Sequence, residues 1–333
     1  MYRYGRNGKA NIVIAAAVVV LLVAVGLFVF LGPKGSETPA EPVRVMESDA
    51  EVLTKLSISD GGDALAAASA NGDVLVWRLP GRRLNVVGKA TDSPATMLNW
   101  SPDGLLLCGD SSGLLRSWQQ PELEESNIDS PQVAVTACVF RQEPADKQLL
   151  LGLSDGRIVT IDASETTLRN SGHPGVKAML ISKDQKTLVS AGSKGKIIWY
   201  NFKHDEVLCT AADHETEIAA LVWSPDAAQL VSADWNGELR IWDAKKRESV
   251  TGASQSDAVS ALVWSENQIV TGSWDGRIRV WSVESNQLNL SFSIDTGRPI
   301  HSLVVESSGE TAFTVSGDRN VREWNLTKPA AAE

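Results

Sequence analysis

A unit of about forty residues recurs seven times along the chain, and this repeat constrains the fold more than any other feature. Each copy ends an alternating apolar run with one bulky residue, which in six copies stands five places after a turn glycine. The seven closing residues are Trp77, Trp118, Ile161, Tyr200, Trp242, Trp281 and Trp324. Their spacing stays between 39 and 43 residues. A near-constant period of this length predicts a repeat architecture.

Each unit holds three short runs rich in β-branched and aromatic residues, with Gly, Asn, Asp and Ser between them, and a weaker fourth run. A four-stranded sheet of this size cannot bury both of its faces alone. Seven such sheets stacked radially cover each other's faces and leave only short edges exposed. We therefore predict an all-β fold, a seven-bladed β-propeller.

The fifth unit, residues 213–244, resembles the WD repeat. His214 stands where that family has its Gly-His pair, and Trp242-Asp243 matches the Trp-Asp signature. The resemblance extends over residues 43–327, although the other units match less well one by one. In the family, a histidine, a hydroxyl residue, an aspartate and the closing tryptophan form a buried hydrogen-bond network. The resemblance implies that this network consists here of His214, Ser232, Asn236 and Trp242, with Asn in the usual place of Asp.

The hydroxyl position of the network differs between units. Ser190, Thr271 and Thr314 supply a hydroxyl in the fourth, sixth and seventh units. The first three units have Ala67, Cys108 and Leu151 instead, so we expect those blades to depend on packing alone.

The two ends of the repeat region predict how the ring closes. Only nine residues follow Trp324, so the seventh unit lacks a fourth strand of its own. Residues 42–48 form an orphan strand before the first unit. We predict that Val43–Met46 pairs with Val321–Leu326 and closes the ring.

A long apolar run near the N-terminus predicts a membrane anchor. Residues 12–31 carry no charge, and twenty helical residues at about 1.5 Å each span the roughly 30 Å hydrocarbon layer. We expect a basic tail (1–10), an uncleaved transmembrane signal-anchor helix (11–32), a linker (33–42), the propeller (43–328) and a C-terminal tail (329–333). A cleaved signal peptide and a buried soluble helix are the alternatives.

The charges around the apolar run favour one orientation. Three basic residues precede it and two follow it, which places the N-terminus in the cytoplasm and the propeller outside. The opposite orientation, with the propeller on the cytoplasmic face, is the alternative.

Composition excludes several classes of function. The formal net charge of −10 argues against nucleic acid as a partner, since nucleic-acid binders carry a basic stripe. The three cysteines and four histidines form no metal-binding spacing, and no nucleophile elbow or phosphate loop is present. We expect no catalysis, no cofactor and no metal. The residues predicted to face the central channel are Thr54, Thr96, Thr136, Lys177, Ala219, Ser260 and His301.

The remaining interpretation is a membrane-tethered protein-interaction scaffold, with a small-ligand sensor or an enzyme at the channel mouth as the alternative.

In the WD-repeat family, the residue before the turn Asp is a frequent contact point on one rim. The corresponding residues here are Trp235 and Trp274, in adjacent blades. The alternative is that both rings pack onto their own turns. The acidic neighbours favour a partner with a basic patch, and they are Glu215, Glu217, Asp234 and Asp257. The oligomeric state stays open.

Overall fold

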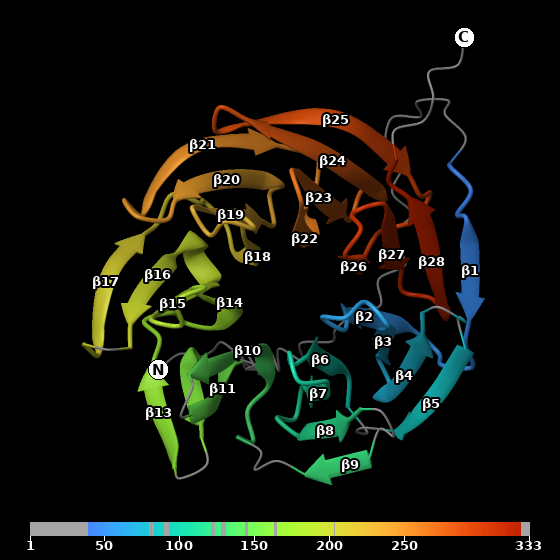
Figure 1. Ribbon diagram of the computed structural model, residues 1–333, viewed down its shortest axis with the longest axis horizontal. Coiled ribbons are helices and arrows are strands. Elements are labelled where there is room, and N and C mark those ends of the chain that lie inside the picture. The colour runs from blue at the N-terminus through green and yellow to red at the C-terminus, as the bar shows by residue number, and fades with distance from the viewer. Residues whose placement is uncertain are drawn as a thin grey trace, which may run out of the picture. The chain divides into compact units, whose positions relative to one another are not determined.

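The computed structural model describes residues 39–327, except residues 80, 82, 90–92, 121–123, 128–130, 144–145, 163–164 and 203. Seven four-stranded antiparallel sheets surround a common axis (Figure 1), which confirms the predicted seven-bladed β-propeller. The predicted basic tail, anchor and C-terminal tail, and the linker up to residue 38, lie outside the described residues. Within the described part of the chain, no helix is long and apolar enough to span a bilayer.

Blades 1 to 4 each follow the chain from the innermost strand outward. Blade 1 consists of β2 (Leu53–Ile58), β3 (Ala64–Ser69), β4 (Asp73–Arg78) and β5 (Arg83–Lys89). Blade 2 consists of β6 (Ala95–Trp100), β7 (Leu105–Asp110), β8 (Leu115–Gln119) and β9 (Glu124–Asn127). Blade 3 consists of β10 (Val135–Glu143), β11 (Asp146–Leu153), β12 (Arg157–Ile161) and β13 (Thr166–Asn170). Blade 4 consists of β14 (Val176–Ile181), β15 (Thr187–Gly192), β16 (Ile197–Asn201) and β17 (Glu206–Ala211), with a 3-10 turn at Ser193–Gly195.

Blades 5 and 6 repeat this order, and blade 7 takes its outer strand from the other end of the chain. Blade 5 consists of β18 (Ile218–Trp223), β19 (Gln229–Asp234), β20 (Glu238–Asp243) and β21 (Glu248–Ser254). Blade 6 consists of β22 (Val259–Ser265), β23 (Gln268–Ser273), β24 (Arg277–Glu284) and β25 (Gln287–Asp295). Blade 7 consists of β26 (Ser302–Val305), β27 (Thr311–Val315), β28 (Asn320–Asn325) and β1 (Arg44–Glu47).

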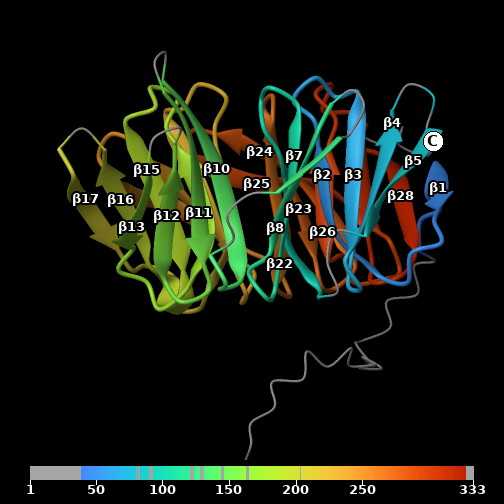
Figure 2. The ribbon, with the colours of Figure 1, turned by 90° about the horizontal axis from the view of Figure 1, so that it is seen from below.

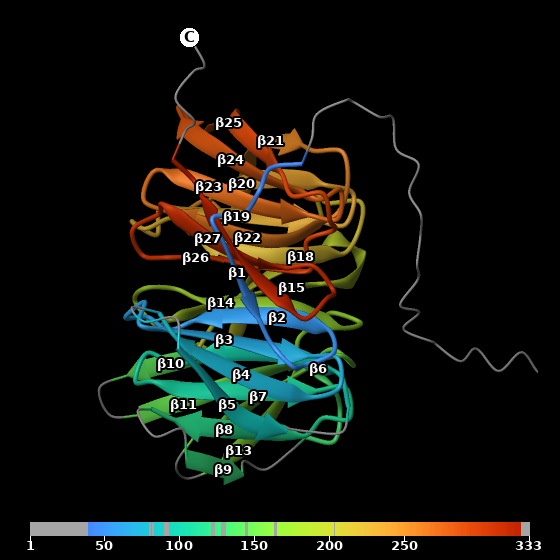
Figure 3. The same ribbon diagram turned by 90° about the vertical axis from the view of Figure 1, so that its right-hand side faces the viewer.

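The ring closes as predicted. Strand β1 lies beside β28 (Figure 2). The two strands are antiparallel, with Met46 opposite Val321. The amide of Val43 donates a hydrogen bond to the carbonyl of Glu323 at 2.8 Å. Met46 is buried in a cluster with Phe313, which lies between blades 7 and 1. In the edge-on view, the first and seventh blades lie directly beside each other (Figure 3). The outer strand of blade 7 therefore joins the two ends of the repeat region.

Apolar packing between neighbouring blades supplies the core. Seven clusters of buried residues are present among the described residues, and each one joins side chains of two adjacent blades. The closing tryptophans Trp77, Trp118 and Trp242 are almost completely buried in them. This arrangement buries the two faces that no single blade could bury alone.

Six inner strands carry a β-bulge at the same place. The bulged residues are six of the predicted channel-facing positions, Thr54, Thr96, Thr136, Lys177, Ala219 and Ser260. Where the bulged residue has a hydroxyl group, it can connect two blades. Thr96 Oγ1 lies 2.7 Å from the carbonyl of Val135 in blade 3, and Ser260 Oγ lies 2.5 Å from that of Ile300 before blade 7.

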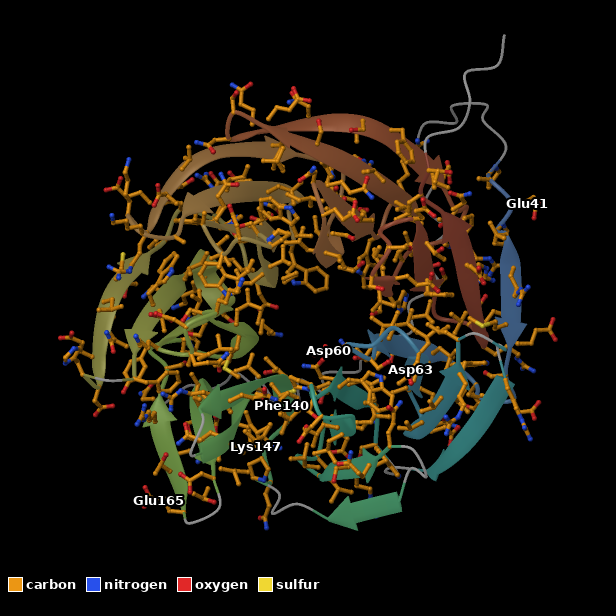
Figure 4. All side chains as sticks on the ribbon, viewed as in Figure 1. Glu41, Asp60, Asp63, Phe140, Lys147 and Glu165 are labelled. Atoms are coloured by element: carbon orange, nitrogen blue, oxygen red, sulfur yellow. The ribbon has the colours of Figure 1, made fainter. Side chains whose placement is uncertain are left out.

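Figure 4 shows Asp60, in the β2–β3 turn, at the inner edge of the ring and Glu165 at its outer edge.

Candidate functional site

The predicted hydrogen-bond network is present in blade 5, with one member corrected. Ser232 Oγ accepts a hydrogen bond from Trp242 Nε1 at 2.8 Å and lies 2.6 Å from His214 Nε2. On the other side of the imidazole, Nδ1 lies 3.2 Å from Asp234 Oδ2. All four side chains are buried, and Ser232 Oγ satisfies both the indole of Trp242 and Nε2 of His214, whereas Nδ1 of His214 faces Asp234 Oδ2 without a hydrogen bond.

The carboxylate of this network belongs to Asp234, and the assignment of Asn236 was wrong. Strand β19 ends at Asp234, whose side chain points inward, whereas Asn236 lies two residues further on in the exposed turn. Asn236 contributes only its backbone amide, which donates to Asp234 Oδ1 at 2.9 Å. The correction also removes Asp234 from the exposed acidic residues of the rim, because its side chain is fully buried.

Blades 6 and 7 have the predicted bond from the closing tryptophan to the hydroxyl, and blade 2 lacks it. Trp281 and Trp324 donate to Thr271 and Thr314 at 3.1 and 2.8 Å. In blade 2, Cys108 occupies the hydroxyl position, and Trp118 Nε1 is buried without a hydrogen-bond partner. Burial raises the pKa of the Cys108 thiol to about 12, so this thiol is a packing group rather than a nucleophile.

Blade 4 pairs His173 with Ser190, whose Oγ lies 3.0 Å from Nε2 of the histidine. Burial lowers the pKa of His173 to about 4. The neutral imidazole is therefore the form that packs in this blade.

One cluster of described residues has the composition of a metal site. One ligand atom each of His214, Asp234 and Glu238 lies within 4.8 Å of the others. Each side chain already has a protein partner: Ser232 for the imidazole, two backbone amides for Asp234, and Arg240 at 2.6 Å for Glu238. The geometry fits a structural network that fixes the β19–β20 turn.

Trp235 lies in the tight turn between β19 and β20. Asp234 Oδ1 accepts the backbone amides of Asn236 and Glu238 at 2.9 and 2.8 Å. Gly237 completes the turn with φ of 81°, a conformation that favours glycine. The Trp235 amide donates to the carbonyl of Glu217 at 3.1 Å. Hydrogen bonds thus fix the backbone of the turn before and after Trp235, while 45% of this residue stays exposed.

Trp274 occupies the same place in blade 6, between β23 and β24. Its amide donates to the carbonyl of Ala258 at 3.1 Å, and 42% of the residue is exposed. The next residue, Asp275, pairs with Arg279 at 2.5 Å. Burial raises the pKa of Asp275, but the hydrogen bonds from Arg279, Ser256 and the Arg277 amide, together with the charge of Arg279, outweigh it and lower the pKa, which keeps the carboxyl ionised. This ion pair fixes the turn that presents the indole.

The two indoles and one imidazole form a continuous aromatic row, which we define as Trp235, Trp274 and His301. The ring centroids of Trp235 and Trp274 are 5.8 Å apart, with the planes tilted by 49°. Trp274 stacks on His301 at 5.2 Å with only 12° between the planes. His301 comes from the segment before β26, where it lies beside Gly317. An added Cβ at Gly317 would lie 2.9 Å from His301 Cε1, so glycine makes room for the third ring.

Acidic side chains surround the aromatic row unequally. Glu217 is engaged, because its carboxylate pairs with Lys177 at 3.0 Å and accepts Ser193 Oγ at 3.2 Å. Glu215 is exposed and Asp257 is partly exposed, and neither forms an ion pair within the described part of the chain. Asp257 lies between the two turns, since its carbonyl approaches Gly237 and the next residue bonds to Trp274. The Asp257 carboxylate thus remains available between the two turns.

The described chain begins at the same end of the blades as the aromatic row. Ala40 donates its amide to the carbonyl of Asp295 at 2.7 Å, and Pro39 lies against Gly297. The loop after Asp295 bonds in turn to the Trp274 turn, through Thr296 N and the carbonyl of Gly276 at 2.8 Å.

Comparison with known proteins supports a WD-repeat fold. The family model of the anaphase-promoting complex subunit 4 WD40 domain matches residues 178–267. Actin-interacting protein 1 of Drosophila melanogaster is 24% identical over 283 residues, which cover 80% of this chain and 46% of that protein. Pre-mRNA-processing factor 19 of Caenorhabditis elegans is 25% identical over 175 residues, which cover 51% of this chain and 35% of that protein.

Solved structures agree with this fold. A chain in the crystal structure of a mitotic checkpoint complex has a TM-score of 0.78 at 18% identity, covering 89% of this chain and 98% of that chain. The closed ring, the network of blade 5 and the WD40 match over residues 178–267 make this chain similar to WD-repeat β-propellers. The chain spans less than half the length of these two curated relatives.

Proposed function

We propose that this protein is a membrane-tethered protein–protein interaction scaffold, without catalysis of its own, and that a partner docks on the aromatic row. One observation carries the proposal: Trp235 and Trp274 stand on hydrogen-bonded turns, are nearly half exposed, and form one row of rings with His301. Aromatic anchors of this kind dominate the binding energy of protein interfaces. The names of relatives, such as an actin-interacting protein and a complex subunit, are consistent with this class of function.

The charge beside the row favours a partner that carries basic residues. Glu215 and Asp257 are the carboxylates there without an ion pair among the described residues. A lysine or arginine of the partner would pair with them, and salt would weaken this attraction.

The proposed tether is the uncharged run of residues 12–31, with the N-terminus in the cytoplasm and the propeller outside. Protease added to intact cells or spheroplasts should degrade the propeller. Protection until lysis would place it on the cytoplasmic face instead.

The docking proposal is tested by a double substitution, Trp235→Ala with Trp274→Ala, in the full-length chain. We expect partner capture per folded molecule to fall at least 30-fold, since truncating an interface anchor commonly costs about 2 kcal/mol or more. The matched control is Leu168→Ala with Val207→Ala, which removes two exposed apolar side chains from outer strands. If the melting temperature of the tryptophan variant falls by many degrees while capture is unchanged, the rings serve packing and the proposal is wrong.

A further inference from the structure

A cavity of about 630 Å³ lies between blades 4 and 5, within the size range of small-molecule sites. Blade 4 lines it with Trp199 of β16 and the β14–β15 turn, and blade 5 lines it with Trp223 and the turns that follow β18 and β20. Because neighbouring strands are antiparallel, these turns lie at the opposite end of the blades from the β19–β20 turn that carries Trp235. The cavity is therefore separate from the aromatic row.

The wall of this cavity contains a buried hydrogen-bond donor without an acceptor. Trp199 is 1% exposed, and among the described residues its Nε1 has no hydrogen-bond partner. The ring packs against Trp242 of blade 5, with centroids 5.7 Å apart. The second indole of the cavity differs, because Trp223 Nε1 donates to the carbonyl of Ile181 at 3.0 Å and so joins the two walls. An N–H group that stays buried and unpaired is unfavourable, so the Trp199 donor needs an acceptor from elsewhere.

Blade 4 is the only blade with a tryptophan at this place, one residue before the closing residue. The other blades have Val76, Ser117, Thr160, Ile241, Val280 and Glu323 there. The fold of a blade therefore does not require an indole at this position.

Arg247 adds a cation on the blade 5 side of the cavity. Its amide donates to the carbonyl of Asp243 at 2.7 Å, and its own carbonyl lies 3.9 Å from Sγ of Cys209. Cys209 is the residue opposite Trp199 in the pairing of β16 with β17, so the Arg247 backbone is held close to the unpaired indole. The Arg247 side chain is partly buried, and within the described part of the chain it makes no hydrogen bond or ion pair. A guanidinium has five donors and no acceptor, so this side chain also needs an anion.

The charges of the lining limit what that anion can be. Three carboxylates accept hydrogen bonds within their own turns, which lower the pKa of all three and keep them ionised. These residues are Asp184, Asp226 and Asp243. The balancing cations are Lys183, Lys245 and Arg247. Since the positive and negative charges of the lining are equal in number, a single negative charge fits better than the two of a phosphate monoester.

We propose that the cavity between blades 4 and 5 binds a small monocarboxylate with an apolar body. The carboxylate accepts hydrogen bonds from Arg247 and from Trp199 Nε1, which gives both groups the acceptor that the chain does not supply. The apolar body lies against the indole of Trp223 and the side chains of Ala227 and Ala244. This site goes beyond the proposed docking at the aromatic row and does not depend on it.

The test is a titration of the full-length chain, in mild detergent, with sodium 3-phenylpropionate, followed by ligand-detected NMR. We expect saturable binding with a Kd of about 1 mM or below, as is usual for a ligand of this size. The uncharged 3-phenylpropionamide has the same body and should bind the wild type at least 10-fold more weakly, a comparison that needs no variant. Phenyl phosphate, as the dianion, should also bind more weakly than the carboxylate.

Two substitutions test the two donors. Arg247→Gln should weaken 3-phenylpropionate binding at least 10-fold, and Trp199→Phe, which keeps a ring but loses the N–H, about 2- to 10-fold. Lys246→Gln is the matched control, because Lys246 is an exposed cation of the same turn that does not line the cavity, and it should keep the wild-type Kd. The double variant Trp235→Ala with Trp274→Ala should keep it as well, which separates this site from the docking surface.

The inference is overturned if the wild type shows no saturable binding, if the amide binds as tightly as the carboxylate, or if either donor variant binds like the wild type. Tighter binding of phenyl phosphate than of 3-phenylpropionate would assign the cavity to a dianion and reject the monocarboxylate. An equal loss in Lys246→Gln and Arg247→Gln would attribute the effect to the overall charge of the turn and also reject the site.

Discussion

Trp274 and His301 stack face to face across the boundary between blades 6 and 7, with centroids 5.2 Å apart and planes 12° apart. The two residues come from different parts of their repeats, a turn between β23 and β24 and the segment before β26. The imidazole therefore covers one face of the indole and leaves the rest to solvent and to Trp235. This contact fixes the orientation of the middle ring of the aromatic row.

Removing the imidazole should weaken partner binding through loss of this stack. Aromatic pairs contribute about 0.5–1.5 kcal/mol beyond the area they bury, so His301→Ala should lower partner affinity by about 2- to 10-fold. His301→Phe keeps a flat ring beside Trp274 and should retain most of the affinity. Affinity is measured by titrating captured partner against the full-length variants. Equal losses in both variants would show that the stack does not position Trp274.

The hydroxyl of Ser232 should contribute strongly to the free energy of unfolding, because two buried groups share it as a hydrogen-bond partner. Ser232→Ala leaves Trp242 Nε1 and His214 Nε2 without their shared partner in a buried place, which costs about 1–3 kcal/mol of unfolding free energy. Cys108→Ala is the control, because Cys108 holds the same position in blade 2 and Trp118 Nε1 has no partner to lose there. Urea unfolding of the two variants gives the comparison. A larger loss in Cys108→Ala would show that packing, and not the hydrogen bonds, dominates at this position.

Ring closure can be tested on two neighbouring residues of β1. Met46 is 6% exposed and packs between blades 7 and 1, whereas 42% of Val45 is exposed on the other side of the strand. Met46→Ala should lower the unfolding free energy by about 2–5 kcal/mol, while Val45→Ala should change it by less than about 0.5 kcal/mol. Thermal and urea unfolding provide the measurement. Similar small effects of both substitutions would contradict a structural role of β1 in closing the ring.

The fold could be predicted from the sequence because a propeller consists of repeated blades, and each blade repeats the same sequence pattern. Seven closing residues at near-constant spacing define the blades, and the orphan strand before the first unit defines the closure. The network required an assignment by position within one repeat, and there an offset of two residues put Asn236 in the place of Asp234. Strand β19 ends at Asp234, and this end decides that the side chain of Asp234, and not that of Asn236, points inward. The spacing of the repeats did not indicate the residue at which the strand ends.

The site was predicted only in part for a different reason. The position of Trp235 and Trp274 on one rim follows from the repeat, but the stack of Trp274 on His301 depends on the distance between two blades. The missing side chain of Gly317 was one sequence signal for that contact.

Stability should fall as the pH drops from about 6.5 to about 4, because of His173. Burial lowers its pKa to about 4 in the folded protein, while the unfolded chain keeps the ordinary value of 6.5. Between these values the unfolded state binds more protons, so acid favours unfolding, by up to about 3 kcal/mol for this one group. Carboxyl groups with a lowered pKa, such as Asp275, add a further loss of stability from about pH 5 downward.

Urea unfolding at several pH values between 7 and 4.5 measures this effect. His173→Gln should cost stability at pH 7, because Ser190 loses its partner, but should flatten the dependence on pH. A smaller slope should remain, since burial also lowers the pKa of His301. His204→Gln removes an exposed histidine and should keep the full slope of the wild type. If His173→Gln keeps that slope as well, another group is responsible for the acid sensitivity and the assignment to His173 is wrong.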